Sequence, residues 1–307
     1  MIYFLVVISF FVSLVLNYFL RKVGEKYGFY DQPYIGPLKI HKKPISYLGG
    51  LAIFLATVFL FFINKSFNFQ IWGILFGGFL TFIPGFWDDL KWKKEGVKPL
   101  KKLFFLVLFS LLVSVILINS EIKINFLPGK IIIFLLTFFY VSGLINAVNF
   151  EDGIDGLAGG LAAISLIGFI ILSIILGNNL GLVISLILLG AVLGFLVFNF
   201  PPAKIFMGDS GAYFLGFVLS ILAMLFSLPF NFKSLIGPIF IIGLPIFDTA
   251  FVILDRIFQR KSIFIGGRRH FYDRIIQRGF STRKTILISY FFQLILVILG
   301  IIIYIYV

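Results

Sequence analysis

The sequence contains no cysteine, and it has no long polar stretch. The absence of cysteine excludes disulfide bonds and thiol catalysis. Because no polar segment is long enough to fold by itself, residues 1–307 are predicted to form a single domain. Only 13% of the residues are charged, whereas 60% are hydrophobic and the mean hydropathy is +1.10. Soluble domains are about 45–50% apolar, so this composition predicts an integral membrane protein.

Acidic residues are also scarce, with 13 Asp and Glu against 26 Lys and Arg, which gives a net charge of +13. In a soluble protein this charge would suggest a nucleic-acid partner, but in a membrane protein it is explained by loops that set the orientation. No nucleic-acid partner is therefore expected. A cleavable signal is not indicated either, because residues 1–20 are apolar from the start and Arg21 and Lys22 follow them. This run is predicted to be a retained first helix with its N-terminus outside.

Long apolar runs dominate the chain, and a helix needs about 20 mostly apolar residues to cross a membrane. The ten candidate runs lie near 1–20, 46–63, 70–87, 103–119, 131–148, 157–176, 180–198, 211–230, 234–254 and 286–307. We therefore expect an all-α integral membrane protein with about ten transmembrane helices. Pro245 predicts a kink or break in the ninth run. The GxxxG spacing of Gly73 and Gly77 raises the possibility of a homodimer.

The charged residues fall mostly in the odd-numbered loops between these runs. Those loops hold 22 of the 26 Lys and Arg residues, leaving Lys65, Lys123, Lys130 and Lys233 on the other side. Because positive loops face the cytoplasm, both termini are predicted to lie outside. Of the 13 acidic residues, 12 share the basic side, and Glu121 is the exception. The five cytoplasmic loops are thus predicted to carry a site for a metal and an anionic substrate.

The segment from Asn146 to Gly160 reads NAVNFEDGIDGLAGG and joins two apolar runs. It contains two asparagines, Asn146 and Asn149, and three carboxylates, Glu151, Asp152 and Asp155. Each Asp-Gly pair favours a tight turn, because glycine accepts a positive φ. A turn between membrane helices needs only one or two polar residues, and unpaired carboxylates at a membrane edge cost free energy. We therefore interpret this segment as part of a functional site.

Adjacent carboxylates, Asp88 and Asp89, end the third run. They repel each other unless a cation or proton lies between them, although nearby lysines could also neutralise them. Phosphoryl transfer requires a base at the interface and a nearby metal, so we interpret the pair as functional. In the first loop, lysines precede Gly49 and Gly50. These residues would suit a phosphate through charge and free backbone N–H groups, or the lysines could be ordinary membrane anchors.

Two later loops carry further candidates. Asp209 lies between glycines just before a helix, where it could bind a cation or serve as an N-cap. The ninth loop contains Arg268, Arg269 and His270. Arginine forks bind diphosphate through two hydrogen bonds, and His270 could donate to the same group. The alternative is a basic loop that touches anionic lipid headgroups.

Three motifs, in this order, resemble those of the polyprenyl-phosphate N-acetylhexosamine-1-phosphate transferases. They are Asp88-Asp89, Asn149-x-x-Asp-Gly-x-Asp-Gly-Leu157 and Phe206-Met-Gly-Asp-Ser-Gly211. The resemblance covers nearly the whole chain. It implies that an N-acetylhexosamine 1-phosphate is transferred from a UDP-sugar to undecaprenyl phosphate, with Mg²⁺ or Mn²⁺, and that UMP is released. It further implies a multi-pass protein among inner-membrane lipids, acting at the first membrane step of cell-envelope glycan synthesis.

The resemblance also implies roles for individual residues. Asp209 matches the principal Mg²⁺ ligand, and Asp88 matches a carboxylate that deprotonates the lipid phosphate and lies at the metal. Asp89 and Asp152 complete the catalytic set. The implied substrate-binding residues are Lys43, Lys102, Asn146, Asn149, Asp155, Asn199, Phe206, Arg268, Arg269 and His270, with Asp155 and Phe206 near uracil and Asn199 in the nucleoside site.

One departure from the family pattern bears on the sugar. The loop that often reads His-x-His-His in the aminosugar branch here reads His270-Phe-Tyr-Asp273, so two histidines are missing. This argues against a phospho-N-acetylmuramoyl-pentapeptide transferase and favours an O-antigen or capsule-initiating type.

A secondary transporter or lipid flippase is the alternative of a different class. Transporters keep ionisable groups near the bilayer midplane within broken helices, and many are built from paired halves. Here the carboxylates cluster at helix ends on one face, only Asp248 lies deeper, and no paired halves are visible.

Overall fold

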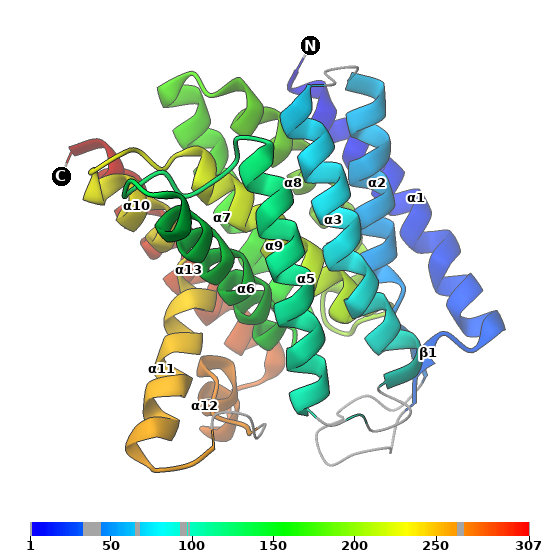
Figure 1. The fold of residues 1–307 in the computed structure, drawn as a ribbon. Helices are drawn as coiled ribbons and strands as arrows, with labels where there is room; N and C mark the ends of the chain where they lie inside the picture. Colours follow the sequence, from blue (N-terminus) through cyan, green and yellow to red (C-terminus); the bar gives the residue numbers. More distant parts are fainter. Residues whose placement is uncertain are drawn as a thin grey trace.

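The computed structural model describes residues 2–32, 44–64, 68–92, 97, 99–262 and 267–306, and most of them are helical (Figure 1). The long helices are α1 (Phe4–Tyr27), α2 (Gly49–Asn64), α3 (Phe69–Trp87), α5 (Pro99–Asn119), α6 (Lys130–Glu151), α7 (Leu157–Leu176), α8 (Asn179–Asn199), α9 (Gly208–Leu225) and α13 (Thr282–Tyr306). The shorter elements are the π-helix η1 (Asp88–Trp92), α10 (Phe232–Ile242), α11 (Leu244–Phe258), α12 (Phe271–Gln277) and the antiparallel strands β1 (Tyr30–Asp31) and β2 (Ile45–Ser46).

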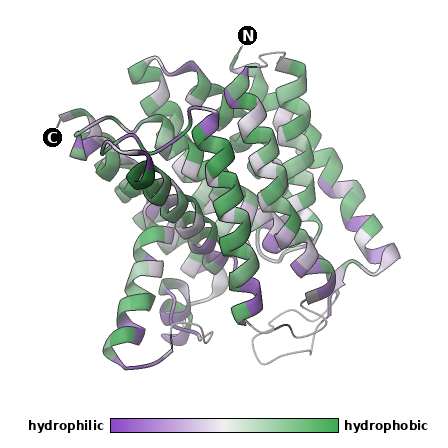
Figure 2. Ribbon diagram, viewed as in Figure 1, coloured by the Kyte–Doolittle hydropathy of each residue, from purple (hydrophilic) through white to green (hydrophobic). Residues whose placement is uncertain are grey.

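Each of the ten predicted apolar runs falls on a helix or a broken helix pair. Within the described residues, eight helices are long and apolar enough to cross a membrane. The α10–α11 pair supplies a ninth crossing, and α2 is a shorter apolar helix of 16 residues. Hydrophobic residues cover the bodies of the helices, while hydrophilic ones gather near their ends (Figure 2). The chain is an all-α integral membrane protein, as predicted.

The centre of the bundle is formed by α8 and α9, which are the most deeply buried of the long helices. Helix α1 lies against α8 so closely that Ser9 and Ser13 each donate a 2.6 Å hydrogen bond to a backbone carbonyl of α8, at Ile187 and Ala191. This approach requires small residues, because a Cβ on Gly190 would lie 2.3 Å from a backbone oxygen of α1. Packing between small residues is the usual way in which helices associate in lipid.

The predicted break in the ninth run is present, and it lies two residues before Pro245. Helices α10 and α11 meet at 90°, with Gly243 between them at φ +52°. The break frees backbone groups that lipid cannot satisfy. Gln293 of α13 satisfies two of them, accepting from Leu244 N at 2.8 Å and donating to Ile241 O at 2.8 Å.

The structure contradicts the use of Gly73 and Gly77 as a dimer face. Both glycines are buried inside the chain, where a Cβ on Gly73 would collide with Ser120, and one on Gly77 with Phe217. The GxxxG spacing therefore serves packing between helices of one chain. The homodimer stays a prediction without that support.

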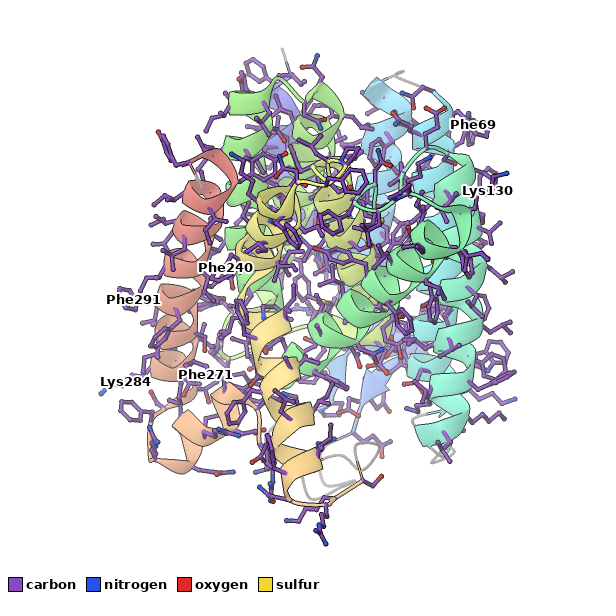
Figure 3. All side chains as sticks on the ribbon, turned by 60° about the vertical axis from the view of Figure 1, so that its left-hand side comes forward. Phe69, Lys130, Phe240, Phe271, Lys284 and Phe291 are labelled. Atoms are coloured by element: carbon purple, nitrogen blue, oxygen red, sulfur yellow. The ribbon has the colours of Figure 1, made fainter. Side chains whose placement is uncertain are left out.

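The two ends of the bundle differ in character. Phe69 and Lys130 lie near one end, and Phe271 and Lys284 lie near the other (Figure 3). The N-terminus lies at the first end, whereas β1, α12 and the far end of α11 lie at the second (Figure 1). The second end also carries η1 and the loops that connect α6 with α7 and α8 with α9, so it brings the predicted site motifs together.

Candidate active site

Asp88 and Asp89 are the most deeply buried of the predicted catalytic residues, each at 1% exposure. Lys102, from the first turn of α5, places its Nζ 2.6 Å from one oxygen of Asp88 and 2.8 Å from the other. The carboxyl group of Asp209 also lies within hydrogen-bonding reach of Asp88. Two carboxylates thus lie against each other, and the ammonium of Lys102 offsets the charge of one of them.

The π-helix directs the neighbouring carboxylates to different partners. Asp89 turns to the start of α9, where its oxygens accept from Asp209 N at 2.9 Å, Ser210 N at 3.0 Å and Ser210 Oγ at 2.9 Å. A helix N-terminus has unpaired N–H groups and a partial positive charge, so a carboxylate stabilises it. Asp89 therefore fixes the backbone that carries Asp209, and its predicted catalytic role stays a prediction. Single-turn π-helices occur frequently at functional sites.

Asn149 links the second motif to the same cluster. Its side-chain amide donates to Asp209 Oδ1 at 3.2 Å. Asn146, almost one turn earlier in α6, donates instead to Ser142 O in its own helix at 2.9 Å. Asp209 lies in the first turn of α9 rather than at its N-cap, which is Met207. The alternative reading of Asp209 as an N-cap is therefore wrong.

The loop between α6 and α7 is tied to the loop between α8 and α9. Asn199 is buried and bridges them, accepting from Gly156 N at 2.9 Å and donating to Ile205 O at 2.8 Å. Asp155 accepts from Ala203 N at 2.9 Å, and Tyr290 of α13 donates to Gly156 O. The amide of Asn199 is thus used to hold backbone, so its predicted contact with a nucleoside stays a prediction.

Two predicted site residues, Asp152 and Phe206, are half-buried and belong to the two loops that Asn199 joins. Asp152 is the C-terminal cap residue of α6, and Phe206 lies just before α9. The backbone N–H of Phe206 donates to Ser46 O at 2.7 Å, which joins its loop to β2. Their contacts with a donor nucleotide stay predictions.

The N–H groups of Gly49 and Gly50 at the start of α2 are not available to a phosphate, so the phosphate alternative loses these two donors. Gly49 N donates to Phe206 O at 3.0 Å, and Gly50 N donates to Met207 O at 2.8 Å. A Cβ on Gly50 would lie 2.3 Å from Gly211 N, so both glycines are needed for this close approach. Lys43, the predicted phosphate ligand of the same loop, lies outside the described residues.

His270 lies at the edge of the site and is oriented by Asp248. His270 Nδ1 lies 2.6 Å from Asp248 Oδ2, and the other oxygen of Asp248 accepts from Phe271 N at 2.7 Å. The imidazole stacks on the ring of Tyr272 at 5.6 Å. Burial raises the pKa of Tyr272, so its hydroxyl remains a donor, directed at Phe150 O.

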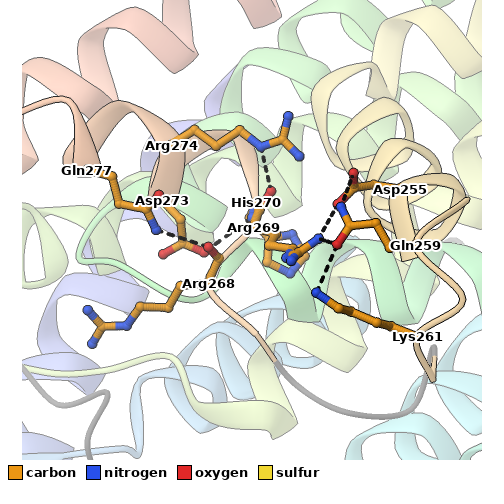
Figure 4. Close-up of polar contacts among 9 residues, drawn as sticks. All are labelled: Asp255, Gln259, Lys261, Arg268, Arg269, His270, Asp273, Arg274 and Gln277. Atoms are coloured by element: carbon orange, nitrogen blue, oxygen red, sulfur yellow. Dashed lines mark hydrogen bonds and ion pairs between the residues drawn. The ribbon is translucent and has the colours of Figure 1, made fainter. Parts of the chain in front are cut away.

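The two arginines before His270 point in different directions (Figure 4). Arg269 forms an ion pair with Asp255 at 2.7 Å and also donates to Gln259. Arg268 extends to the opposite side (Figure 4). Arg269 is therefore engaged within its own loop, and diphosphate binding by either arginine stays a prediction.

Sequence reasoning missed four contributors to this region: Ser210, Asp248, Tyr272 and the partnership of Glu151 with Asp248. Asp248 could have been found, because an ionisable residue within an apolar helix indicates a functional group with a partner. Tyr272 gave no signal, since only the fold places its hydroxyl over Gly153, where a Cβ would collide with it.

The residues present fit a Mg²⁺ site that has only two protein ligands. The described part of the chain contains no cluster of three or more His, Cys, Asp or Glu residues that could hold a metal. Mg²⁺ commonly uses only one or two carboxylates and takes its other ligands from water and substrate phosphates. Asp88 and Asp209 form such a pair.

Comparisons with known proteins agree with the motifs. A family model described as glycosyl transferase family 4 matches residues 71–227, which include all three motifs. The chain is 33% identical to a probable undecaprenyl-phosphate N-acetylglucosaminyl 1-phosphate transferase of Bacillus subtilis, over 93% of this chain and 81% of that protein. It is 30% identical to a phospho-N-acetylmuramoyl-pentapeptide-transferase of Dictyoglomus turgidum, over 97% and 96% of the two chains. A decaprenyl-phosphate N-acetylglucosaminephosphotransferase of Mycobacterium tuberculosis is 29% identical, over 82% and 70%.

Proposed function

The chain belongs to glycosyl transferase family 4, and from this premise we propose that it transfers an N-acetylhexosamine 1-phosphate from a UDP-sugar to undecaprenyl phosphate. The observation that carries the proposal is the Asp88–Asp209–Lys102 cluster at the polar end of an apolar bundle. The relative named as an N-acetylglucosaminyl 1-phosphate transferase, 33% identical over 93% of this chain, supports an N-acetylhexosamine donor.

In the proposed step, an oxygen of the lipid phosphate bonds to the phosphorus that carries the sugar, and the bond from that phosphorus to the UMP oxygen breaks. UMP leaves with the bonding electron pair. Catalysis of such a step depends on positioning and on cations that neutralise charge. Lys102 supplies one cation, and Asp88 is the group that would take a proton from the lipid phosphate.

A magnesium ion, or manganese in its place, would be held by Asp209 and Asp88. When bound, it would neutralise the diphosphate of the donor and stabilise the leaving UMP. Asn149 would orient the Asp209 carboxylate through its amide. Asp89 would hold the start of α9 in place beneath it.

The surroundings of the site suit a lipid acceptor. Helix α11 contacts α6 and leaves the bundle after the 90° break. Exposed apolar side chains continue along it, including Phe247, Phe251 and Leu254. They would contact the polyprenyl chain while its phosphate reaches the carboxylates.

We place the site on the cytoplasmic face of the inner membrane. The support is the distribution of positive charge, since 22 of 26 Lys and Arg residues belong to the loops on the side of the site. A UDP-sugar donor is a cytoplasmic nucleotide, so the donor and the site would share a compartment. Asp248, the one carboxylate that lies deeper than the helix ends, contacts His270 beside the same site.

The proposal is tested by UMP release from purified protein in detergent, with undecaprenyl phosphate, Mg²⁺ and a panel of UDP-N-acetylhexosamines. Release that requires both the lipid and one particular UDP-sugar is expected, and a chelator should stop it. Full turnover in the presence of chelator would contradict the metal. Absence of release with every donor, from protein that stays monodisperse, would contradict the reaction.

A further inference from the structure

Glu151 is a buried carboxyl group for which the proposed reaction has no use. It is the last residue of α6, directly before Asp152, and only 1% of its surface is exposed. Among the described residues, neither of its oxygens accepts a hydrogen bond from a protein donor. A buried carboxylate without a donor or cation would cost several kcal/mol, so its environment needs explanation.

The group that Glu151 faces is another carboxyl, Asp248 of α11, which lies within hydrogen-bonding reach. Asp248 is also buried; one of its oxygens accepts from Phe271 N, and the other lies 2.6 Å from His270 Nδ1. Asp152 follows Glu151 directly, and Asp273 and Tyr272 of α12 are further titratable groups near it among the described residues. The described groups around Glu151 therefore offer it an acceptor, Asp248, rather than a cation.

Two carboxylates in contact cannot both be ionised in a buried site unless a cation separates them. The neighbours decide which one holds a proton. Asp248 accepts a hydrogen bond from Phe271 N and lies against the imidazole of His270, and both contacts favour its ionised form. Glu151 accepts none from the described residues, and as a carboxylic acid it would gain a donor that Asp248 can accept.

We propose that Glu151 is a protonated positioning residue whose O–H donates to Asp248, forming a chain from Glu151 through Asp248 to His270. The ionised Asp248 then holds the hydrogen of His270 on Nδ1, so Nε2, on the other side of the ring, does not contact Asp248. His270 is the N-cap residue of α12, and it is buried, with 8% of its surface exposed. The hydrogen-bond chain therefore fixes which nitrogen of His270 contacts a substrate phosphate, in the way an orienting carboxylate sets a histidine tautomer.

The arrangement also connects two parts of the site. Glu151 adjoins the Asp152–Asp155 motif, whereas Asp248 and His270 belong to α11 and the start of α12. The ring of Tyr272 stacks on His270, and its hydroxyl meets Phe150 O. The proposed hydrogen bond thus joins the end of α6 to the loop that takes the place of the family's histidine-rich segment. This inference rests on the proposed function only for the substrate that His270 would contact.

The test compares two substitutions of similar size. Glu151→Gln keeps a neutral donor, and Glu151→Met removes hydrogen bonding while filling the same space. Infrared difference spectroscopy of wild type against Glu151→Gln, near neutral pH, should show the C=O stretch of a protonated carboxyl group in the wild type alone. This readout requires no turnover, so it is independent of the reaction.

The kinetic arm uses the UMP-release assay with the same proteins. Glu151→Gln should keep kcat within about threefold of wild type, whereas Glu151→Met should lower it about tenfold, the usual effect of losing an orienting partner. Thermal unfolding of both variants controls for folding. Absence of the infrared band, or an equal loss of kcat in the two variants, would overturn the proposal. A wild type that shows the band and never turns over would overturn the proposed function instead.

Discussion

The polar end of the bundle contains two regions of opposite character. Around Asp209, two carboxylates lie against each other and Lys102 pairs with one of them. Around Gly156, by contrast, the side chains of Asn199, Asp155 and Tyr290 are each matched to a backbone group. Excess negative charge is costly unless a ligand compensates it, whereas matched hydrogen bonds stabilise a shape. We therefore propose that the first region binds a ligand, whereas the second holds the loops around it.

This difference makes a strong prediction for Asp209. Asp209→Asn should lower kcat about a thousandfold, because losing a metal-binding carboxylate removes about 4 kcal/mol of transition-state stabilisation. The melting temperature should stay the same or rise, since the substitution removes repulsion with Asp88. UMP release and thermal unfolding measure the two effects. Glu25→Gln, on the exposed surface of α1, is the control for a change of carboxyl to amide. A large fall in melting temperature would place Asp209 in the structural region instead.

A somewhat smaller loss of activity is expected when Lys102, the cation of the same region, is replaced. Lys102→Met removes the ammonium that pairs with Asp88 and leaves the two neighbouring carboxylates, Asp88 and Asp209, without it. We expect kcat/KM to fall about a hundredfold, since breaking a close charge pair typically costs about 3 kcal/mol. Lys102→Arg keeps the charge and should recover most of the activity in the same assay. Equal loss in both variants would mean that the charge of Lys102 is not what the site requires.

Substitutions in the region around Gly156 should change the free energy of unfolding. Asn199→Leu leaves Gly156 N and Ile205 O without their partner, which should lower the free energy of unfolding by about 3 kcal/mol. Thermal unfolding in detergent, followed by circular dichroism, measures this change. Asn146→Leu is the matched comparison, because Asn146 only donates to Ser142 O within its own helix and should cost less. If the two variants unfold at the same temperature, the bridge made by Asn199 does not hold the loops.

The smallest effect should come from the outer contact of the same region. Tyr290→Phe removes one hydrogen bond to Gly156 O and keeps the ring that packs on Gly160, so the expected loss is about 1 kcal/mol. Activity should be nearly unchanged when it is measured below the melting transition. A loss of turnover without any change in melting temperature would show that α13 takes part in the chemistry.

The sequence predicts most of the membrane part, because the length of an apolar run is set by the thickness of the bilayer. It also predicts the break near Pro245, since proline cannot continue a helix. It does not predict η1 or the seven-residue α12, which are too short to show a periodic pattern. Nor does it show that the N–H groups of Gly49 and Gly50 are used by Phe206 and Met207, because those contacts depend on how α2 meets α9.

The residues of the candidate site also divide into those that the sequence reveals and those that only the fold reveals. The residues of the Asp209 region stand out as charges at the ends of apolar runs, so residue type alone reveals them. The chain from Glu151 to His270 joins residues far apart in the sequence, and only the fold brings them together. Asn199 shows the same limit, since a buried asparagine that bridges two loops has the same residue type as one that contacts a ligand.

The packing of α1 against α8 has a consequence for the order in which the helices assemble during synthesis. Ser9 and its partner Ile187 are separated by 178 residues, as are Ser13 and Ala191. At roughly 5–20 residues per second, α1 is made roughly ten to forty seconds before the helix it packs against. During that time its serine hydroxyls face lipid or other early helices, and the carbonyls of their own helix are the nearest acceptors. The first helix thus waits for α8 with α2 as a native neighbour, and a chain stalled before α8 would leave the serine face of α1 without its final partner.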